Sequence, residues 1–249
     1  MYYQTYKRLF DVTLAAFLTI VFLPLILVIA VLIKFDSAGP VFFRQVRTGR
    51  FEKSFSILKF RTMHHGSMGL NITVCGDRRI TRIGRVLRKT KLDEIPQLIN
   101  VLVGDMSIIG PRPQVHSDLV HYDRAARNII FSSRPGMTDL ASLLYIHEER
   151  LLAESNDPMK TYFEVILPEK NRLRMFHLVQ ESFVFDIKIL ILTGLKIVFR
   201  QKLPFIDSLS HAVSNDTPSV GKGRVLLGVS NESATLINES SPLINVKVE

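Results

Sequence analysis

The sequence predicts a mainly helical α/β protein that is associated with a membrane. A stretch without any charged residue lies near the N-terminus, short apolar segments with the composition of strands follow it, and helical periodicity dominates after residue 78. These patterns divide the chain into a membrane hairpin, a small α/β domain with interfacial amphipathic helices, and a weakly ordered tail, at residues 1–36, 37–203 and 204–249.

The uncharged stretch at residues 12–33 reads VTLAAFLTIVFLPLILVIAVLI and is long enough to cross a bilayer. Basic residues flank both ends, which favours a cytosolic position for both. Pro24 lies in the middle, where it removes a backbone donor, and the half before it spans only about 18 Å. These features favour a helix-break-helix hairpin that enters one leaflet and returns. An ordinary spanning helix with a kink at Pro24 is the alternative.

The composition narrows the chemistry. The 249 residues carry a formal net charge of +9, which indicates an anionic partner such as lipid headgroups, nucleotide phosphates or nucleic acid. Cys75 is the only cysteine, so neither an internal disulfide nor a cysteine-based zinc site can form. The phosphate-loop, dinucleotide-binding and serine-hydrolase motifs are absent from the sequence, so ATPase, dehydrogenase and serine-hydrolase functions have no support.

Further elements follow from periodicity. A basic helix face is predicted from residue 78 onward, either on a membrane surface or simply solvated. The pattern also predicts strands at 41–43 and 55–60 around a polar linker, helices at 96–103, 148–154 and 158–180, and an interfacial or core helix at 183–199.

Asp93 and Glu94 are adjacent carboxylates just before the helix predicted at 96–103. Acidic residues at helix starts are usually caps, which is the simpler interpretation. The surrounding cations favour a functional one, because a site for a phosphate substrate needs cations for the phosphoryl oxygens and a carboxylate to bind Mg²⁺ or attack phosphorus. The nearby basic residues considered as phosphate ligands are Arg85, Arg88 and Lys91.

Two further arginines lie beside prolines. Arg112 stands between Pro111 and Pro113, and Arg134 precedes Pro135 and a glycine. The prolines restrict the backbone and so reduce the entropy lost when a guanidinium is presented to a phosphate. Either segment could equally be a structural turn with an exposed arginine.

Several motifs occur in one order that resembles the bacterial sugar transferases, the monotopic phosphoglycosyl transferases. They are KRLFDVTLA from Lys7, GPVFFRQ from Gly39, KFRTM from Lys59, TRIGR from Thr81, KLDEIPQL from Lys91, GDMS from Gly104, GPRP from Gly110 and RPGMT from Arg134.

The resemblance implies a re-entrant helix and a small α/β catalytic region on the cytosolic face of the bacterial inner membrane. Asp93 would be the nucleophile that attacks the sugar-bearing phosphate of a UDP-sugar and releases UMP, and Glu94 would help to hold Mg²⁺. A polyprenyl phosphate such as undecaprenyl phosphate would then accept the sugar phosphate. The partners implied are the UDP-sugar, the polyprenyl phosphate and the lipid of one leaflet, without nucleic acid. Neither the donor sugar nor homo-oligomer formation can be read from the sequence.

Two positions depart from the family pattern. Leu23 stands where members often have serine before the hairpin proline, and residues 139–142 read DLAS where many members have a glycine and a glutamine. The second difference reflects either sugar preference or subgroup. Two competing functions are a non-catalytic basic scaffold or nucleic-acid binder, which leaves the acidic pair without a role, and an inactive relative, which the intact Asp93–Glu94 pair argues against.

Overall fold

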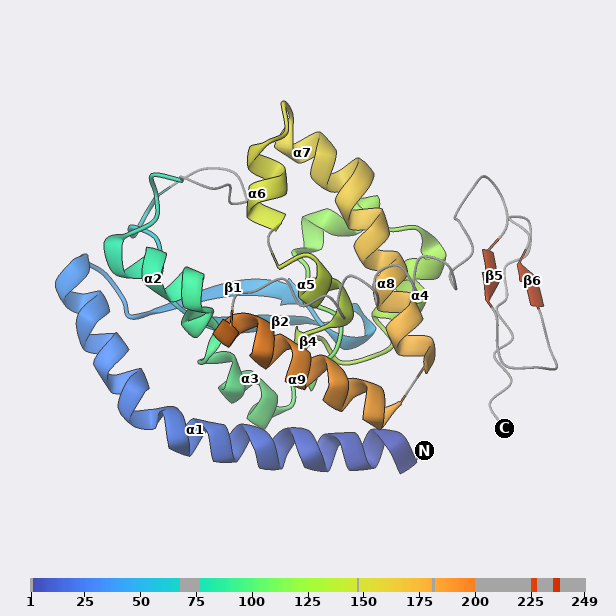
Figure 1. The fold of residues 1–249 in the computed structure, drawn as a ribbon, viewed down its shortest axis with the longest axis horizontal. Coiled ribbons are helices and arrows are strands. Elements are labelled where there is room, and N and C mark those ends of the chain that lie inside the picture. The colour runs from blue at the N-terminus through green and yellow to red at the C-terminus, as the bar shows by residue number, and fades with distance from the viewer. Residues whose placement is uncertain are drawn as a thin grey trace. The chain divides into compact units, whose positions relative to one another are not determined.

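The computed structural model describes residues 2–67, 77–146, 148–180, 182–199, 225–227 and 235–237 (Figure 1). Contacts divide the chain into two units, Met1–Gln201 and Lys202–Glu249. The first unit contains both the apolar N-terminal segment and the residues of the candidate site, so these two parts form one compact body.

The first unit is mainly helical with two small sheets, as expected. Its helices are α1 (Tyr2–Asp36), α2 (Arg82–Thr90), α3 (Gln97–Val103), α4 (Arg124–Ile130), α5 (Leu140–Leu144), α6 (Glu148–Ala153), α7 (Pro158–Thr161), α8 (Leu167–Gln180) and α9 (Phe183–Phe199). Short helical turns are η1 (Arg50–Glu52), η2 (Leu92–Glu94), η3 (His116–His121) and η4 (Tyr162–Ile166). The strands are β1 (Phe42–Thr48), β2 (Ser54–Phe60), β3 (Ser107–Ile109) and β4 (Gly136–Thr138).

Helix α1 corrects one expectation about the N-terminus. The helix continues through Pro24 from Tyr2 to Asp36, so there is no break that separates two helices. Instead, the long helix bends along its length (Figure 1). A proline removes one hydrogen bond and crowds the preceding turn, and a helix with room on one side accommodates this by bending.

Both ends of α1 are attached to the same body. Near its start, Arg8 Nη1 donates to the Val101 carbonyl of α3 at 2.8 Å. At its end, Asp36 Oδ2 accepts a hydrogen bond from the backbone N–H of Ile83 in α2 at 3.0 Å. Because residues so far apart on one helix contact a single compact unit, the helix lies along the domain instead of projecting away from it.

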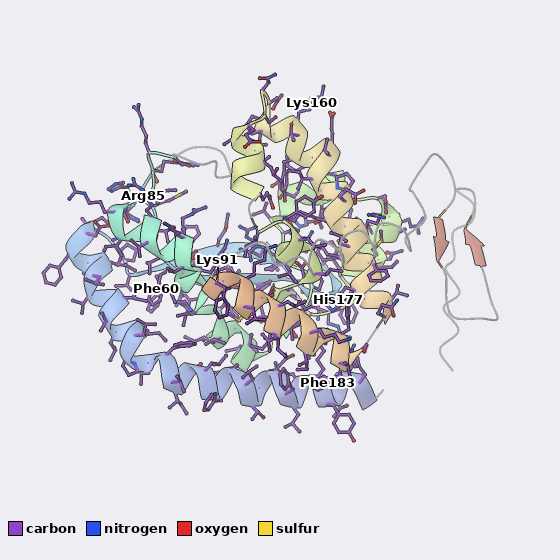
Figure 2. All side chains as sticks on the ribbon, viewed as in Figure 1. Phe60, Arg85, Lys91, Lys160, His177 and Phe183 are labelled. Carbon is purple, nitrogen blue, oxygen red and sulfur yellow. The ribbon has the colours of Figure 1, made fainter. Side chains whose placement is uncertain are left out.

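Helix α1 presents most of its apolar surface outward. Within the described chain, the stretch from Tyr3 to Asp36 is the one helix long and apolar enough to cross a membrane, and only 11% of its most apolar window is buried. The neighbouring helices add exposed apolar side chains, such as Val103 of α3 and Val184 of α9. Phe183 at the start of α9 packs edge-on against Phe10, with ring centroids 5.2 Å apart (Figure 2).

Strands β1 and β2 form an antiparallel hairpin in which Phe42 pairs with Phe60 and Thr48 with Ser54. The predicted strand at 55–60 is confirmed, but the first half of the predicted polar linker is wrong, because β1 continues to Thr48. Arginines at positions 44 and 47 make this part of β1 look like a polar linker in the sequence. The hydrogen bonds to β2 pair its backbone N–H and C=O groups, and local composition does not reveal such a long-range contribution.

The C-terminal helices of the first unit agree with the periodicity. The helix predicted at 158–180 is present as α7, the π-helical turn η4 and α8 in succession, and the helix predicted at 183–199 is α9. An apolar core holds α8 against α4 and η3, and its buried members include Leu119, Ala126, Ile130, Tyr162 and Leu167.

The second unit contains one antiparallel strand pair within the part that the structure describes, β5 (Val225–Leu227) and β6 (Thr235–Ile237). Val225 pairs with Ile237. The weak order predicted for the remainder of the tail concerns residues outside the described ranges.

Strands β3 and β4 bring two turn motifs together. They are parallel, with Ser107 opposite Gly136 and Ile109 opposite Thr138, so the Gly110 turn and the Pro135 turn lie against each other. A Cβ atom on Gly136 would lie 2.1 Å from the Gly110 backbone nitrogen. Only glycine permits this approach of the two backbones.

We therefore expect Gly136→Ala to destabilise the protein by at least about 1–3 kcal/mol, because neither backbone can move without breaking the β3–β4 ladder. The thermal unfolding midpoint in detergent measures this. Gly194→Ala is the matched control, since a Cβ at Gly194 meets no atom within 4 Å and lies within helix α9. It should stabilise the helix by up to about 1 kcal/mol. Equal midpoints for the two variants would contradict the packing argument.

Candidate active site

Asp93 and Glu94 lie on the turn η2, between α2 and α3. Lys91 ends α2 in a left-handed conformation, with φ +60°, which turns the chain so that the two carboxylates follow at once. The N-cap of α3 is Pro96, and no side chain caps that helix. Neither carboxylate caps α3 through its side chain, so the capping interpretation of the sequence pattern does not hold.

Glu94 is paired with two cations from distant parts of the sequence. Its Oε1 accepts a hydrogen bond from Lys59 Nζ of β2 at 3.0 Å. Arg112, which follows β3, contacts both carboxylate oxygens, with Nη1 3.2 Å from Oε2 and Nη2 bonded to Oε1. A forked arginine–carboxylate contact fixes direction as well as charge, so Glu94 is held in one orientation.

The two neighbouring carboxyls have opposite electrostatic environments. Burial opposes the ionisation of Glu94, but Arg112 and Lys59 outweigh it and hold the pKa of Glu94 well below its ordinary range. Burial and then the charge of Glu94 raise the pKa of Asp93, while Lys59 and the α2 cations act against this rise. The ionised form of Glu94 is thus strongly stabilised, whereas nearby cations do not fully offset the effect of burial on Asp93.

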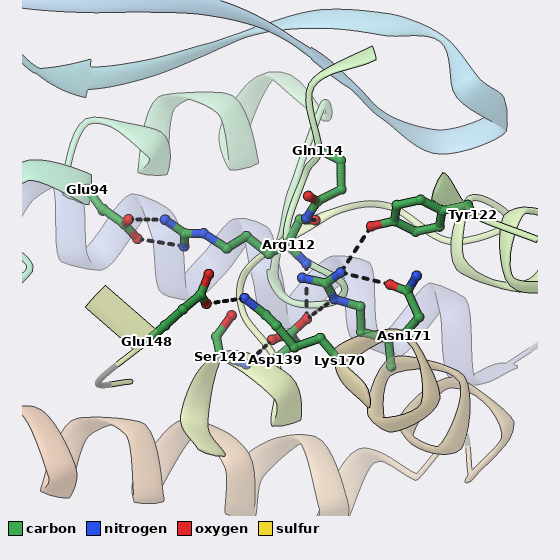
Figure 3. A network of polar contacts seen from close by, with 10 residues as sticks. Glu94, Arg112, Gln114, Tyr122, Asp139, Ser142, Glu148, Lys170 and Asn171 are labelled. Atoms are coloured by element: carbon green, nitrogen blue, oxygen red, sulfur yellow. Dashed lines mark hydrogen bonds and ion pairs between the residues drawn. The ribbon is translucent and has the colours of Figure 1, made fainter. Parts of the chain in front are cut away.

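A second layer of contacts holds Arg112 (Figure 3). The Arg112 backbone N–H donates to Asp139 Oδ2 at 3.1 Å, and Arg174 Nε donates to the same oxygen at 3.0 Å. Arg174 also donates to the Tyr122 hydroxyl and to Asn171 Oδ1. The side chains of Asp139 and Arg174 are both completely buried. This buried network determines where the Arg112 main chain lies, and hence where its guanidinium meets Glu94.

A cavity of about 970 Å³ opens beside these residues. Its basic lining consists of Arg47, Arg88, Lys91, Arg112 and Lys170. Apolar side chains from α1 and α9 form another part of the wall, among them Leu18, Phe22, Leu190 and Ile197. The cavity therefore joins a strongly basic region beside Glu94 to an apolar region next to the exposed face of α1.

The structure brings together most of the residues selected from the sequence. Arg88, Lys91 and Arg112 line the cavity with Glu94, and Asp93 is buried immediately next to Glu94. Arg85 is exposed on α2 and does not line the cavity (Figure 2). Arg134 donates to the Gly104 carbonyl at 3.2 Å and is also absent from the cavity wall. A phosphate-binding role for Arg85 and Arg134 stays a prediction.

Asp93 and Glu94 can be compared with the needs of Mg²⁺. Among the described residues, no group of three or more His, Cys, Asp or Glu side chains gathers to bind a metal. Enzymes commonly hold Mg²⁺ by one or two carboxylates plus substrate phosphates and waters. An ionised carboxylate has about four acceptor positions. Three donors occupy Glu94, two at Oε1 and one at Oε2, so the remaining position on Oε2 and the neighbouring Asp93 fit such an ion.

Comparison with known proteins identifies the family of this chain. A sequence model of the bacterial sugar transferases matches residues 2–200. The chain belongs to this family. The match includes α1 as well as the cavity and its lining, and it covers nearly all of the first compact unit.

Three relatives illustrate the similarity of this sugar transferase to characterised proteins. A UDP-glucose:undecaprenyl-phosphate glucose-1-phosphate transferase of Caulobacter vibrioides is 46% identical over 144 residues, which are 55% of this chain and 53% of that protein. The enzyme of the same name from Xanthomonas campestris is 35% identical over 202 residues, which are 79% of this chain and 40% of that protein. The exopolysaccharide production protein PSS of Rhizobium leguminosarum is 42% identical over 151 residues, 55% of this chain and 72% of that protein. The sugar transferase thus spans about half the length or less of the two enzymes named for glucose-1-phosphate transfer.

Two contacts of the candidate site have no counterpart in the sequence analysis, those of Lys59 and Asp139. Lys59 belongs to a motif that carried the resemblance, yet no local pattern joins it to Glu94, 35 positions away. Asp139 lies where the sequence departs from the family pattern, and it proves to cap α5 and to support Arg112. Asp at a helix start is a capping signal that could have identified the cap, but not its second partner.

The Asp139 carboxylate has a testable effect on stability. Burial opposes its ionisation, but Arg174 and the hydrogen bonds from Ser142 lower its pKa from 3.8 to about 2. A depressed folded-state pKa contributes stability above the unfolded pKa, and this contribution disappears as the pH falls from about 4 to about 2. We expect Asp139→Asn to destabilise the sugar transferase by about 2 kcal/mol at pH 7 and by less at pH 3.

Thermal unfolding of both proteins in detergent at the two pH values measures this difference. Glu52→Gln serves as a control, because Glu52 pairs with Arg127 at the surface and exposed pairs contribute little. A destabilisation by Asp139→Asn that is equally large at both pH values would mean that packing, not the charge, supplies the stability.

Proposed function

We propose that this sugar transferase moves a sugar 1-phosphate from a UDP-sugar to a polyprenyl phosphate and releases UMP, through a covalent intermediate on Asp93. The observation that carries the proposal is the pairing of a buried carboxyl, Asp93, with the ion-paired Glu94 next to a basic cavity. The printed names of the Caulobacter and Xanthomonas relatives describe the same kind of transfer, from UDP-glucose to undecaprenyl phosphate.

The first step is attack by an Asp93 carboxylate oxygen on the phosphorus that bears the sugar. The new Asp93–phosphorus bond forms as the bond from that phosphorus to the UMP oxygen breaks, and UMP leaves with the electron pair. An anionic nucleophile and an anionic diphosphate repel each other, so the step requires fixed positive charge. Arg112 and Lys59, which already converge on Glu94, together with Arg88 and Lys91 on the α2 side, supply that charge.

In the second step, a phosphate oxygen of the polyprenyl phosphate attacks the same phosphorus. The Asp93–phosphorus bond breaks, the carboxylate is restored, and the sugar diphosphate remains on the lipid. Asp93 and the free acceptor position on Glu94 Oε2 would hold Mg²⁺, which when bound would neutralise charge on the diphosphate. The Glu94 contacts with Lys59 and Arg112 keep its carboxylate directed toward that position.

The proposal extends to the membrane. The apolar side of α1 would enter one leaflet of the bacterial inner membrane and return, with the catalytic cavity on the cytosolic face. Attachment of both ends of α1 to one compact body supports this, since a body on one side of the bilayer keeps both ends on that side. The polyprenyl phosphate would then reach the cavity from the lipid, past Leu18 and Phe22.

Asp93 and Glu94 should respond differently to amide substitution. Asp93→Asn removes the attacking anion, so UMP release from the UDP-sugar should fall by several orders of magnitude. Glu94→Gln weakens metal binding and the contact with Arg112, so its activity should fall less and recover in part at higher Mg²⁺. UMP release by detergent-solubilised protein, with a panel of UDP-sugars and polyprenyl phosphate, measures both.

A trapping experiment provides the direct control. Wild type incubated with the UDP-sugar alone should gain the mass of one sugar phosphate on the peptide that contains Asp93, and Asp93→Asn should gain none. An adduct on another residue, or an active Asp93→Asn enzyme, would overturn the assignment.

The re-entrant geometry predicts the labelling of two introduced cysteines. Two single-cysteine variants, Gln4→Cys and Arg50→Cys, are made with Cys75 replaced by serine. Both introduced cysteines should be shielded from an impermeant thiol reagent outside intact cells and should be labelled after lysis. Shielding follows if both ends of the apolar stretch stay in the cytosol. Labelling of position 4 alone in intact cells would establish a spanning helix.

A further inference from the structure

A set of polar side chains in the cavity is not used by the chemistry proposed above. Ser142 of α5, Glu148 of α6 and Lys170 of α8 line the same cavity as Glu94 and Arg112 (Figure 3). They come from three helices that follow β4, whereas the acidic pair comes from η2. The cavity therefore has a second polar region, built separately from the one that contains Glu94.

These groups have hydrogen-bonding capacity that the protein does not satisfy. The Ser142 hydroxyl oxygen is buried, and no partner for it is found among the described residues. Lys170 is 5% exposed and donates to Glu148 Oε2, which uses one of its three N–H donors. Buried polar groups without partners are rare in folded proteins, and a ligand that fills the cavity can supply the missing ones.

The chemistry of the set excludes two ligand classes at this position. Glu148 neutralises the charge of Lys170, so the pair offers a phosphate no net positive charge. A polyprenyl chain would leave the Ser142 hydroxyl without a partner, and it would offer no hydrogen bond to the remaining donors of Lys170 or acceptors of Glu148. A neutral group rich in hydroxyls suits all three, because a carboxylate accepts from a hydroxyl, an ammonium donates to one, and a serine does both.

We propose that Ser142, Glu148 and Lys170 form the subsite that binds the hydroxyl groups of the transferred sugar. The proposal rests on the proposed function and adds to it the residues that distinguish one donor sugar from another. The sugar of a UDP-sugar is bonded to the phosphorus that Asp93 attacks, so it must occupy the part of the cavity next to Arg112. Sites that hydrogen-bond a substrate hydroxyl reject analogues that lack it, because the buried groups are then left unpaired.

The subsite also explains a feature of the sequence. Residues 139–142 depart from the pattern of many family members, and the structure gives this segment two roles. Asp139 caps α5 by accepting a hydrogen bond from the Ser142 backbone N–H, and thereby presents the Ser142 side chain on the first turn of the helix. The departure therefore places a hydroxyl in the cavity wall.

The test compares the affinity for the donor with the affinity for UDP, which lacks the sugar. With the UDP-sugar that wild type consumes fastest, Ser142→Ala should lower kcat/KM by about 10-fold, and Glu148→Gln by about 10- to 100-fold. Inhibition by UDP should stay within about twofold of wild type, because its phosphates bind elsewhere in the cavity. Glu169→Gln, an exposed neighbour on α8 that does not line the cavity, is the matched control and should change neither value.

The outcomes separate this inference from the proposed function. A wild type that consumes donor, with variants unchanged in kcat/KM, overturns the subsite alone. Variants that lose donor and UDP affinity equally also overturn it, because the groups would then hold the nucleotide or simply join α6 to α8. A wild type that consumes no UDP-sugar overturns the proposed function, and this inference with it.

Monodeoxy UDP-sugars identify the hydroxyl. The donor lacking the hydroxyl that Ser142 binds should be consumed at nearly the same rate by wild type and Ser142→Ala, because the interaction is already lost. The other deoxy donors should keep the difference of about 10-fold. A constant difference across all deoxy donors would overturn a direct contact between Ser142 and the sugar.

Discussion

The contact between Arg112 and Glu94 links the turn η2 to the rest of the domain. The Arg112 side chain donates hydrogen bonds to both carboxylate oxygens of Glu94, and its backbone N–H donates to the completely buried Asp139. Replacing a buried ion pair by apolar residues is often neutral or stabilising, so buried charge of this kind is not explained by stability alone. Its consequence here is geometric: because the buried Asp139 fixes the Arg112 main chain, the Arg112 side chain fixes the position of the Glu94 carboxylate on its short turn.

The same contact separates the properties of two adjacent carboxyls. Lys59 and Arg112 both direct their charge at Glu94 and lower its pKa, and the anion so formed helps to raise the pKa of Asp93. Residues that are identical in charge and adjacent in sequence thus acquire different chemical characters. The proposed roles would need that difference. A nucleophile such as Asp93 must be able to leave its contacts to form a new bond, whereas Glu94 must keep its contacts to hold a metal ion in place.

The apolar helix α1 is part of the first compact unit. Its two ends contact α3 and α2, and Leu18 and Phe22 from its middle line the cavity that contains Glu94. Burial of the helix is slight, so its outer face is available to lipid while its inner face forms a wall of the site. A membrane-facing element and a basic cavity therefore belong to one compact unit, as a reaction between a water-soluble donor and a lipid acceptor would require.

Most of the helices and part of the candidate site could be predicted from the sequence. The predictions failed for part of β1 and stay untested for Arg85 and Arg134. Periodicity located α9 and most of α8, and the order of motifs selected Asp93, Glu94 and Arg112. Composition misjudged residues 44–48, because their place in β1 depends on pairing with β2. Arg85 and Arg134 were chosen for the same reasons as Arg88 and Arg112, yet only the latter two line the cavity.

The apolar stretch, the acidic pair and the family can be read from the sequence, because they are properties of consecutive residues and their order. The cations that reach Glu94, the support of Arg112 by Asp139 and the shared cavity wall of Ser142, Glu148 and Lys170 follow from the folded chain. Ion pairs and cavity walls join side chains that lie tens of positions apart in the sequence. Their assembly depends on how the β3–β4 pair and the helices pack, which no local pattern encodes.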